Sequence, residues 1–307
     1  MTKKGLSRIV VCLSLFLFSV ASAQAFSELI IFGDSLEDTG NFASLGGSPL
    51  PPPFFMNRIT NGPVAADVLA EGLGLTAAPS LHFSGAAAGK NYAVAAARAH
   101  TAGLIDLTTQ VGAFLLNHGG TAPPDALYLV GIGGNDVRDA RDAPNNATAR
   151  RIIESAADMT AMNLERLAAA GARNIMVLNL PDVGAIPETA LIADMTGDKA
   201  LIKKTMKKTR RFNRKLARRL KKLERALGID FIEFDTFAFF NNILAHPAAF
   251  GLNNTTDACF SSVTFTFHPD CHFGASFDQF AYFDEIHPTG RVHMLWGKAL
   301  LETVQSR

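Results

Sequence analysis

The sequence predicts an α/β protein in which helices cover both faces of a parallel sheet. Short apolar runs alternate along the chain with longer amphipathic segments, which is the pattern of strands joined by helices. Two of these runs end at glycine with a polar residue close behind, Ser35 after the first run and Asn135 after the third. Parallel strands bring their carboxyl ends to one edge of the sheet, where such folds bind ligands. We therefore expect a functional site at that edge.

The predicted elements follow one another with short connections. The strands are expected at residues 28–32, 90–94, 126–132, 174–180 and 229–234. The helices are expected at residues 65–73, 105–118, 148–170, 198–227 and 288–304, the last with Pro288 in its first turn. No Gly/Ser linker, Pro-rich hinge or internal repeat interrupts residues 26–307, so we expect a single domain there.

Residues 1–25 have the pattern of a signal peptide. Lys3, Lys4 and Arg8 form a basic start, an apolar stretch follows at residues 9–20, and small residues at 21–25 offer cleavage sites. The apolar stretch is short for a bilayer span. We expect export through an inner membrane and a periplasmic or secreted mature chain.

Two cysteines remain after that cleavage, Cys259 and Cys271. Paired thiols tend to become disulfides in an oxidising compartment, so we expect a disulfide that closes a short loop. Two free buried thiols are the simplest alternative. A zinc site with His268 and His272 is disfavoured, because such sites usually show closer cysteine pairs.

The segment 203–222 is strongly basic. It begins with Lys203, ends with Lys222, and contains twelve Lys or Arg and no acidic residue. Apolar residues at helical spacing give it one buried stripe. It is either a solvated helix face or a contact for an anionic surface such as lipid headgroups. We do not expect a nucleic-acid partner, because an exported chain without a nucleic-acid-binding motif offers no basis for one.

Aromatic residues are concentrated between residues 231 and 283. The part from 251 to 283 has weak periodicity and is long for a plain loop, and long ordered loops are often functional. Phe277, Phe280, Tyr282 and Phe283 form either a small satellite core or a wall for an apolar substrate group, where their faces could also receive a cationic leaving group such as choline.

Ser35 stands where a nucleophile would be useful. It lies within residues 33–41 (GDSLEDTGN), and a helix beginning just after it would aim backbone N–H groups at its surroundings. A serine hydroxyl becomes a good nucleophile when a base removes its proton, and the base works better when a carboxylate orients it. Asp284 and His287 supply both groups. Taken alone, each motif is also compatible with an ordinary turn.

Acyl transfer also needs hydrogen-bond donors aimed at the developing oxyanion. Asn135 follows two glycines at the end of an expected strand, and its amide can donate. The backbone N–H groups of Ser35 and of a residue after segment 90–94 could complete the set. The alternative for residues 133–136 (GGND) is a strand-to-helix turn.

Four blocks in this order resemble the SGNH, or GDSL, hydrolase superfamily. They are residues 33–36 (GDSL), residues 91–94 (NYAV), residues 133–136 (GGND) and the D-x-x-H of Asp284 and His287. The resemblance covers essentially all of residues 26–307. The patterns D-x-G-N at 38–41 and NR-x-TNG at 57–62 are similar to a bacterial branch of secreted esterases, phospholipases and lipid acyltransferases.

The resemblance implies a three-layer α/β/α sandwich with a five-stranded, flavodoxin-like parallel sheet, and neither a cofactor nor a metal. It implies Ser35 as nucleophile, His287 as base and Asp284 as its orienter. The implied oxyanion donors are the Ser35 N–H, the Asn135 amide and the N–H of Ala96. The family usually carries glycine where Ala96 stands. A backbone donor survives this replacement if φ is negative there, while the methyl group is expected to narrow the acyl pocket.

The leading functional prediction is a monomeric serine ester hydrolase that acts on short-chain or choline-type esters. The first alternative is a phospholipase, lysophospholipase or lipid acyltransferase at a membrane. Another class would be an inactive binding module on the same fold. A carbohydrate deacetylase is disfavoured because Trp296 is the only tryptophan. No barrel-like segments follow residue 304, which disfavours an autotransporter passenger.

Overall fold

The computed structural model describes residues 26–307 with the exception of residues 86 and 273–274. The predicted signal peptide, residues 1–25, lies outside the described residues. Within them, no helix combines the length and the apolar character needed to cross a bilayer.

The main sheet is parallel. Its four strands, in spatial order, are β1 (Leu29–Gly33), β2 (Leu127–Gly131), β3 (Asn174–Leu178) and β4 (Ile232–Phe234). The first three are in register, so that Gly33, Gly131 and Leu178 end side by side. Their side chains are almost all buried, as expected for strands covered on both faces.

Segment 90–94, expected as the second strand, lies along β1 but shares only one β-bridge with it. Ile31 and Asn91 form a parallel bridge, and three backbone hydrogen bonds join residues 90–94 to β1. The other edge of this segment bonds to residues 78–80, and the Asn91 side chain bonds to the backbone of Glu37 and Ala93. The backbone bonds hold the segment beside β1, but regular strand pairing gives the main sheet of the described residues four strands, and the expected fifth is not confirmed.

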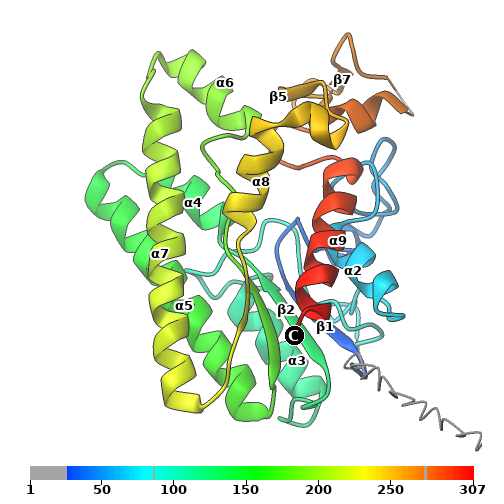
Figure 1. The fold of residues 1–307 in the computed structure, drawn as a ribbon, viewed down its shortest axis with the longest axis vertical. Helices are drawn as coiled ribbons and strands as arrows, with labels where there is room; N and C mark the ends of the chain where they lie inside the picture. Colours follow the sequence, from blue (N-terminus) through cyan, green and yellow to red (C-terminus); the bar gives the residue numbers. More distant parts are fainter. Residues whose placement is uncertain (1–25, 86, 273–274) are drawn as a thin grey trace, which may run out of the picture.

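Helices lie on both sides of this sheet (Figure 1). On one side α4 (Gly134–Arg141), α5 (Asn146–Ala170) and α7 (Leu201–Leu227) pack together, and α3 (Leu107–Asn117) joins α5. On the other side α2 (Ala65–Gly72) packs against α9 (Gly290–Gln305). The remaining helices are α1 (Asn41–Gly46), α6 (Pro187–Thr196) and α8 (Thr236–Ala245), with 3-10 turns at Pro247–Phe250 and Ala275–Gln279.

Two predicted helix starts are wrong. No helix begins just after Ser35, because the chain makes a turn in which Glu37 and Asp38 donate backbone hydrogen bonds to the Asp34 carbonyl, and α1 starts only at Asn41. Helix α9 starts at Gly290 and not in a turn that contains Pro288, because the Thr289 hydroxyl caps it by accepting from the Val292 N–H.

The long basic helix is confirmed and is held by one apolar stripe. Phe212, Leu216 and Leu220 recur at four-residue spacing on α7 and are buried, while most of the Lys and Arg side chains face outward. The helices that α7 packs against are α5, α4 and α6.

The aromatic stretch forms a satellite core. Strand β5 (Asn254–Ala258) pairs with β8 (Phe280–Tyr282), and β6 (Phe260–Ser261) pairs with β7 (Thr266–Phe267). The expected disulfide joins Cys259 and Cys271, with Cα atoms 5.4 Å apart. Around it pack the buried rings of Phe260, Phe277, Phe280 and Phe283. Because these rings are buried, Phe277, Phe280 and Phe283 do not offer their faces to a choline group or to an acyl chain.

Candidate active site

Ser35, His287 and Asp284 lie in one hydrogen-bonded chain. His287 Nε2 is 2.8 Å from Ser35 Oγ, and His287 Nδ1 is 2.8 Å from both carboxylate oxygens of Asp284. Ser35 and His287 are each 8% exposed and Asp284 is more deeply buried. The structure thus brings together three residues from opposite ends of the sequence at the carboxyl end of β1.

The loop that carries Asp284 and His287 is fixed from inside and outside. Asp284 Oδ1 accepts the backbone N–H groups of Ile286 and His287 at 2.8 and 2.7 Å. From outside, Thr60 Oγ1 donates to the Pro288 carbonyl at 2.8 Å and Asn61 Oδ1 accepts from the Gly290 N–H at 2.9 Å. The pattern at 57–62, which the sequence marked only as a resemblance, therefore anchors the histidine loop.

The three expected oxyanion donors all have a free hydrogen. Within the part of the chain that the structure describes, no group accepts a hydrogen bond from the N–H of Ser35 or of Ala96. The Asn135 amide nitrogen donates one hydrogen to the Ala97 carbonyl at 3.0 Å, and its second hydrogen has no acceptor among the same residues. The arrangement can stabilise a negative oxygen beside Ser35.

The backbone at Ala96 differs from the expected one. Its φ is +68°, in the left-handed region, and its side chain is exposed. Alanine can replace glycine without strain only where φ is negative. The positive φ at Ala96 therefore means that the backbone is strained there. The conformation is imposed by neighbours: the Asp38 carboxylate accepts the Ala95 N–H at 2.8 Å, and the Asp136 carboxylate accepts the N–H groups of Ala99 and His100.

Two buried carboxyl groups lie beside the nucleophile. Burial raises the pKa of Asp34 to about 6, although the Leu36 N–H and the charge of His287 act in the opposite direction. Burial and the neighbouring Asp34 also raise the pKa of Glu37. The Glu37 carboxyl fills the space next to Gly131, where a Cβ atom would come within 2.5 Å of it. This close approach requires glycine at the end of β2.

A small apolar cavity opens next to Ser35. Its volume is about 50 Å³. Its polar lining is Asp34, Ser35, Asn135 and Arg138. The apolar side chains that line it are Leu36, Leu180, Pro181, Val183, Ile186 and Ile286. Ala96 is not part of this lining, so this cavity gives no support to the expectation that its methyl group narrows the acyl pocket. Of the four aromatic residues proposed as a wall, Tyr282 alone lines a neighbouring cavity, on the far side of Leu36, Ile186 and Ile286.

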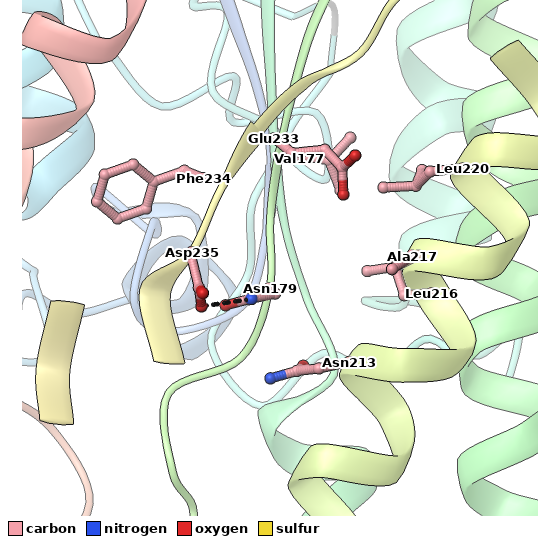
Figure 2. Close-up of a pocket in the computed structure, with 9 residues that line it drawn as sticks. All are labelled: Val177, Asn179, Asn213, Leu216, Ala217, Leu220, Glu233, Phe234 and Asp235. Carbon is pink, nitrogen blue, oxygen red and sulfur yellow. Dashed lines mark hydrogen bonds between the residues drawn. The ribbon is translucent and has the colours of Figure 1, made fainter. Parts of the chain in front are cut away.

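A larger cavity lies elsewhere at the same end of the sheet. It measures about 280 Å³ and lies between α7 and the ends of β3 and β4 (Figure 2). Its amides are already engaged: Asn179 donates to Asp235 at 2.8 Å, and Asn213 exchanges hydrogen bonds with the backbone of Leu180. No nucleophile–base pair lines it among the described residues, so size alone does not identify the functional cavity.

Reasoning from sequence missed several residues of the site. Arg138, Ile186, Ile286, Thr60 and Asn61 were not singled out for it. Arg138 had a detectable signal, since it lies three residues after Asn135 at the start of a helix and so on the same face. Ile186 and Ile286 had none, because their contact depends on the packing of two distant loops.

Comparisons with known proteins concern the family and the fold of this chain. A family model described as GDSL-like lipase/acylhydrolase matches residues 29–300. The thermolabile hemolysin of Vibrio parahaemolyticus is 28% identical over 90% of this chain, and the match covers 63% of the hemolysin, so the chain spans less than two thirds of that relative. The phosphatidylcholine–sterol acyltransferase of Aeromonas hydrophila is 27% identical over 93% of this chain and 80% of its own length.

Among solved structures, a catalytic mutant of an acetylxylan esterase from Geobacillus stearothermophilus is similar in fold. The TM-score is 0.51 at 13% identity, over 92% of this chain and 96% of the esterase chain. At this identity the likeness concerns the α/β fold with its parallel sheet.

Proposed function

This chain belongs to the GDSL-like lipase/acylhydrolase family, a family of carboxylic ester hydrolases, and on that premise we propose that it cleaves esters through an acyl-enzyme on Ser35. One observation carries the proposal: His287 lies within 2.8 Å of both the Ser35 hydroxyl and the Asp284 carboxylate. In the reaction, His287 Nε2 takes the proton of Ser35 Oγ while this oxygen attacks the ester carbonyl carbon. Asp284 holds the Nδ1–H and stabilises the imidazolium that forms.

The carbonyl oxygen becomes negative in the tetrahedral intermediate. We propose that the N–H groups of Ser35 and Ala96 and the Asn135 amide donate to it. When the intermediate collapses, His287 gives its proton to the leaving alcohol and the acyl group stays on Ser35. Water then attacks the acyl-enzyme by the same route in reverse, releasing the acid and restoring the serine.

The preferred acyl group is proposed to be short. The cavity of about 50 Å³ beside Ser35 has room for about four groups the size of a water molecule. Apolar residues make up most of its lining, which suits a hydrocarbon chain of a few carbons. The choline-type leaving group loses support, because the rings expected to receive it are buried.

Removal of the nucleophile tests the proposal. Ser35→Ala should lower the hydrolysis of p-nitrophenyl butyrate by roughly 10⁴-fold or more, while far-UV circular dichroism stays unchanged. Near wild-type turnover by the folded variant would rule out Ser35 as nucleophile and with it the acyl-enzyme.

A second candidate is cleavage or transfer of acyl chains from membrane lipid. Two surface features favour it besides the name of the Aeromonas relative. The corner between α6 and α7 exposes Leu191, Met195 and Ile202 by 49, 87 and 44%. Helix α7 continues from this corner with the cationic side chains between Lys203 and Lys222. Among these, only Lys204, Arg211 and Arg219 form ion pairs within the described structure. Exposed apolar groups flanked by cations suit an anionic bilayer surface.

The two candidates are separated by reversing charge on α7. Lys203, Lys204, Lys207 and Lys208 are changed together to glutamate, and the variant is assayed on p-nitrophenyl butyrate and on anionic phospholipid vesicles. Loss of the vesicle activity alone, with vesicle lipid the better substrate of the wild type, would replace the short-chain proposal with the lipid one. Equal activities of variant and wild type on both substrates would rule out the proposed contact between α7 and the membrane.

Three further proposals rest on the sequence. We propose that residues 1–25 are removed on export, that residues 26–307 form one domain, and that the mature protein acts as a monomer in the periplasm or outside the cell. N-terminal sequencing of the exported protein tests the removal of residues 1–25, and sedimentation tests the monomeric state.

We also propose that segment 90–94 acts as a fifth strand of an α/β/α sandwich, supported by its three backbone hydrogen bonds to β1.

A further inference from the structure

The Asn135 amide is held at both ends. Its nitrogen donates to the Ala97 carbonyl, and its oxygen accepts from Arg138 Nη1 at 3.0 Å. Asn135 and Arg138 are three residues apart on α4 and so lie on one face of the helix. A flipped amide would direct its NH₂ group at the guanidinium, which has no acceptor. The contact with Arg138 therefore fixes which end of the amide faces the nucleophile.

Arg138 is in turn held by Glu188 on α6. Its Nε is 2.8 Å from Glu188 Oε2, and its Nη2 donates to Glu188 Oε1, so the guanidinium and the carboxylate meet as two forks. This pairing leaves Nη1 to bond the Asn135 oxygen. A lysine could supply the charge but could not make these three contacts in one plane.

A second arginine completes the network. Arg141 Nη1 donates to Glu188 Oε2 at 2.8 Å and to Thr189 Oγ1 at 3.0 Å, and its side chain is buried. Burial alone would raise the pKa of Glu188, but the hydrogen bonds and charges of Arg138 and Arg141 outweigh it and hold this pKa below its ordinary value. Glu188 is thus an ionised and oriented acceptor.

The same network reaches the histidine loop. The backbone N–H of Glu188 donates to the Glu285 carbonyl at 2.8 Å, and Glu285 lies between Asp284 and His287. Arg138 also lines the cavity beside Ser35. One residue of α6 therefore contacts both sides of the site, the amide side through Arg138 and the base side through the backbone.

We propose that Arg138 and Glu188 are positioning residues that hold and polarise the Asn135 amide for the oxyanion. The inference rests on the proposed function of Asn135. A guanidinium bonded to the amide oxygen draws electron density from the nitrogen, so the free N–H becomes a stronger donor through a chain of hydrogen bonds. Because the donor is fixed before substrate binds, it needs no reorganisation during the reaction.

A double-mutant cycle tests this inference. Arg138→Gln and Glu188→Gln should each lower kcat on p-nitrophenyl butyrate by roughly 10- to 100-fold, less than a lost donor, with KM within about threefold of the wild type. Combined with Asn135→Ala, neither should lower kcat by more than about twofold further, because the group they act on is absent. Arg138→Lys should recover only part of the loss.

Arg219→Gln is the matched control. Arg219 forms an ion pair with Asp158 far from the site, and its removal should leave kcat unchanged. Affinity for a butyl boronic acid, which forms a tetrahedral adduct with a serine, should fall in parallel with kcat. Thermal unfolding of each variant identifies a loss due to misfolding, and Glu188→Gln serves in place of Arg138→Gln if the latter does not fold.

Two results would overturn the inference. The first is an equal loss of kcat on Arg138→Gln with and without Asn135, and the second is a change in KM or stability alone for either substitution. Failure of the proposed function looks different, because Asn135→Ala alone would then leave kcat unchanged.

Discussion

Two cavities at the carboxyl end of one sheet differ in what their polar groups do. The cavity over β1 and β2 is small, but Ser35 and Asn135, which line it, keep hydrogens without an acceptor among the described residues. The cavity over β3 and β4 is several times larger, yet its amides bond the chain itself (Figure 2). The difference indicates that unused donors beside a nucleophile identify the reactive cavity better than volume does.

Replacing one asparagine in each cavity should give the largest difference in kcat. Asn135→Ala should lower kcat by roughly 10²–10³-fold with a smaller change in KM, the size of one lost oxyanion donor. Asn179→Ala, in the larger cavity, should leave kcat within about twofold and lower stability, because the Phe237 N–H loses its acceptor. Steady-state kinetics and urea unfolding of both variants check this. An effect of Asn135→Ala on KM alone would assign it to substrate binding.

The region under the histidine loop should also respond differently to acid. His293 is buried and accepts a hydrogen bond from the Ala65 N–H through Nδ1, and burial, aided by the charge of His287, lowers its pKa to about 3. It is therefore neutral in the folded chain, while in the unfolded chain it takes up a proton below pH 6.5. Its contribution to stability is complete above pH 6.5 and is lost progressively as the pH falls toward 3.

The expected loss attributable to His293 is about 2–3 kcal/mol between pH 7.5 and pH 4.5. Urea unfolding at both pH values should show that His293→Gln has a pH dependence weaker by that amount than the wild type. His246→Gln, at an exposed position on the end of α8, should keep the wild-type dependence. Identical slopes for all three proteins would show that His293 is not a buried neutral base.

Enlarging the two cavities one at a time should change the preference for acyl-chain length in only one case. Ile186 and Ile286 form part of the wall between the cavity beside Ser35 and the neighbouring one lined by Phe240 and Tyr282. Ile186→Ala should join the two and raise the kcat/KM ratio of octanoyl to butyryl esters by about tenfold, the size of a few methylene contacts. Leu216→Ala, which enlarges the cavity of Figure 2, should leave the ratio unchanged. A chain-length series of p-nitrophenyl esters measures both, and equal shifts would contradict the assignment.

The smallest expected effect concerns Ala96. Because its φ of +68° is costly for alanine, Ala96→Gly should raise the free energy of unfolding by about 0.5–1 kcal/mol, the strain relieved being partly offset by backbone entropy. The N–H remains, so kcat should stay within about twofold. Lower stability of the glycine variant would mean that the left-handed backbone is not strained.

The sequence was informative where chemistry and spacing coincide. Ser35, Asn135, Asp284 and His287 could be predicted because each follows a strand end or lies in a compact motif, and the structure joins three of them by hydrogen bonds. The disulfide between Cys259 and Cys271 could be predicted from the expected compartment and from the pairing of the two cysteines. Glu188 could not be, because its partners lie about fifty residues away on another helix and a single glutamate in the first turn of a helix is common.

Segment 90–94 shows a different limit of sequence reasoning. Its residues favour a strand, and it does lie along β1 through three backbone hydrogen bonds, but only Asn91 forms a β-bridge with that strand. The backbone at Ala96 was likewise set by remote carboxylates, Asp38 and Asp136, rather than by local preference. Side-chain hydrogen bonds across the chain therefore explain the difference at Ala96.

Labelling of the nucleophile tests the central claim most directly. A fluorophosphonate reacts covalently with a serine that a neighbouring base activates, and peptide mass spectrometry identifies the residue that it modifies. We expect one label per molecule, on Ser35, formed in proportion to the loss of esterase activity and abolished in His287→Ala. Complete inactivation with the label on another residue, or full activity of a protein labelled on Ser35, would contradict the account.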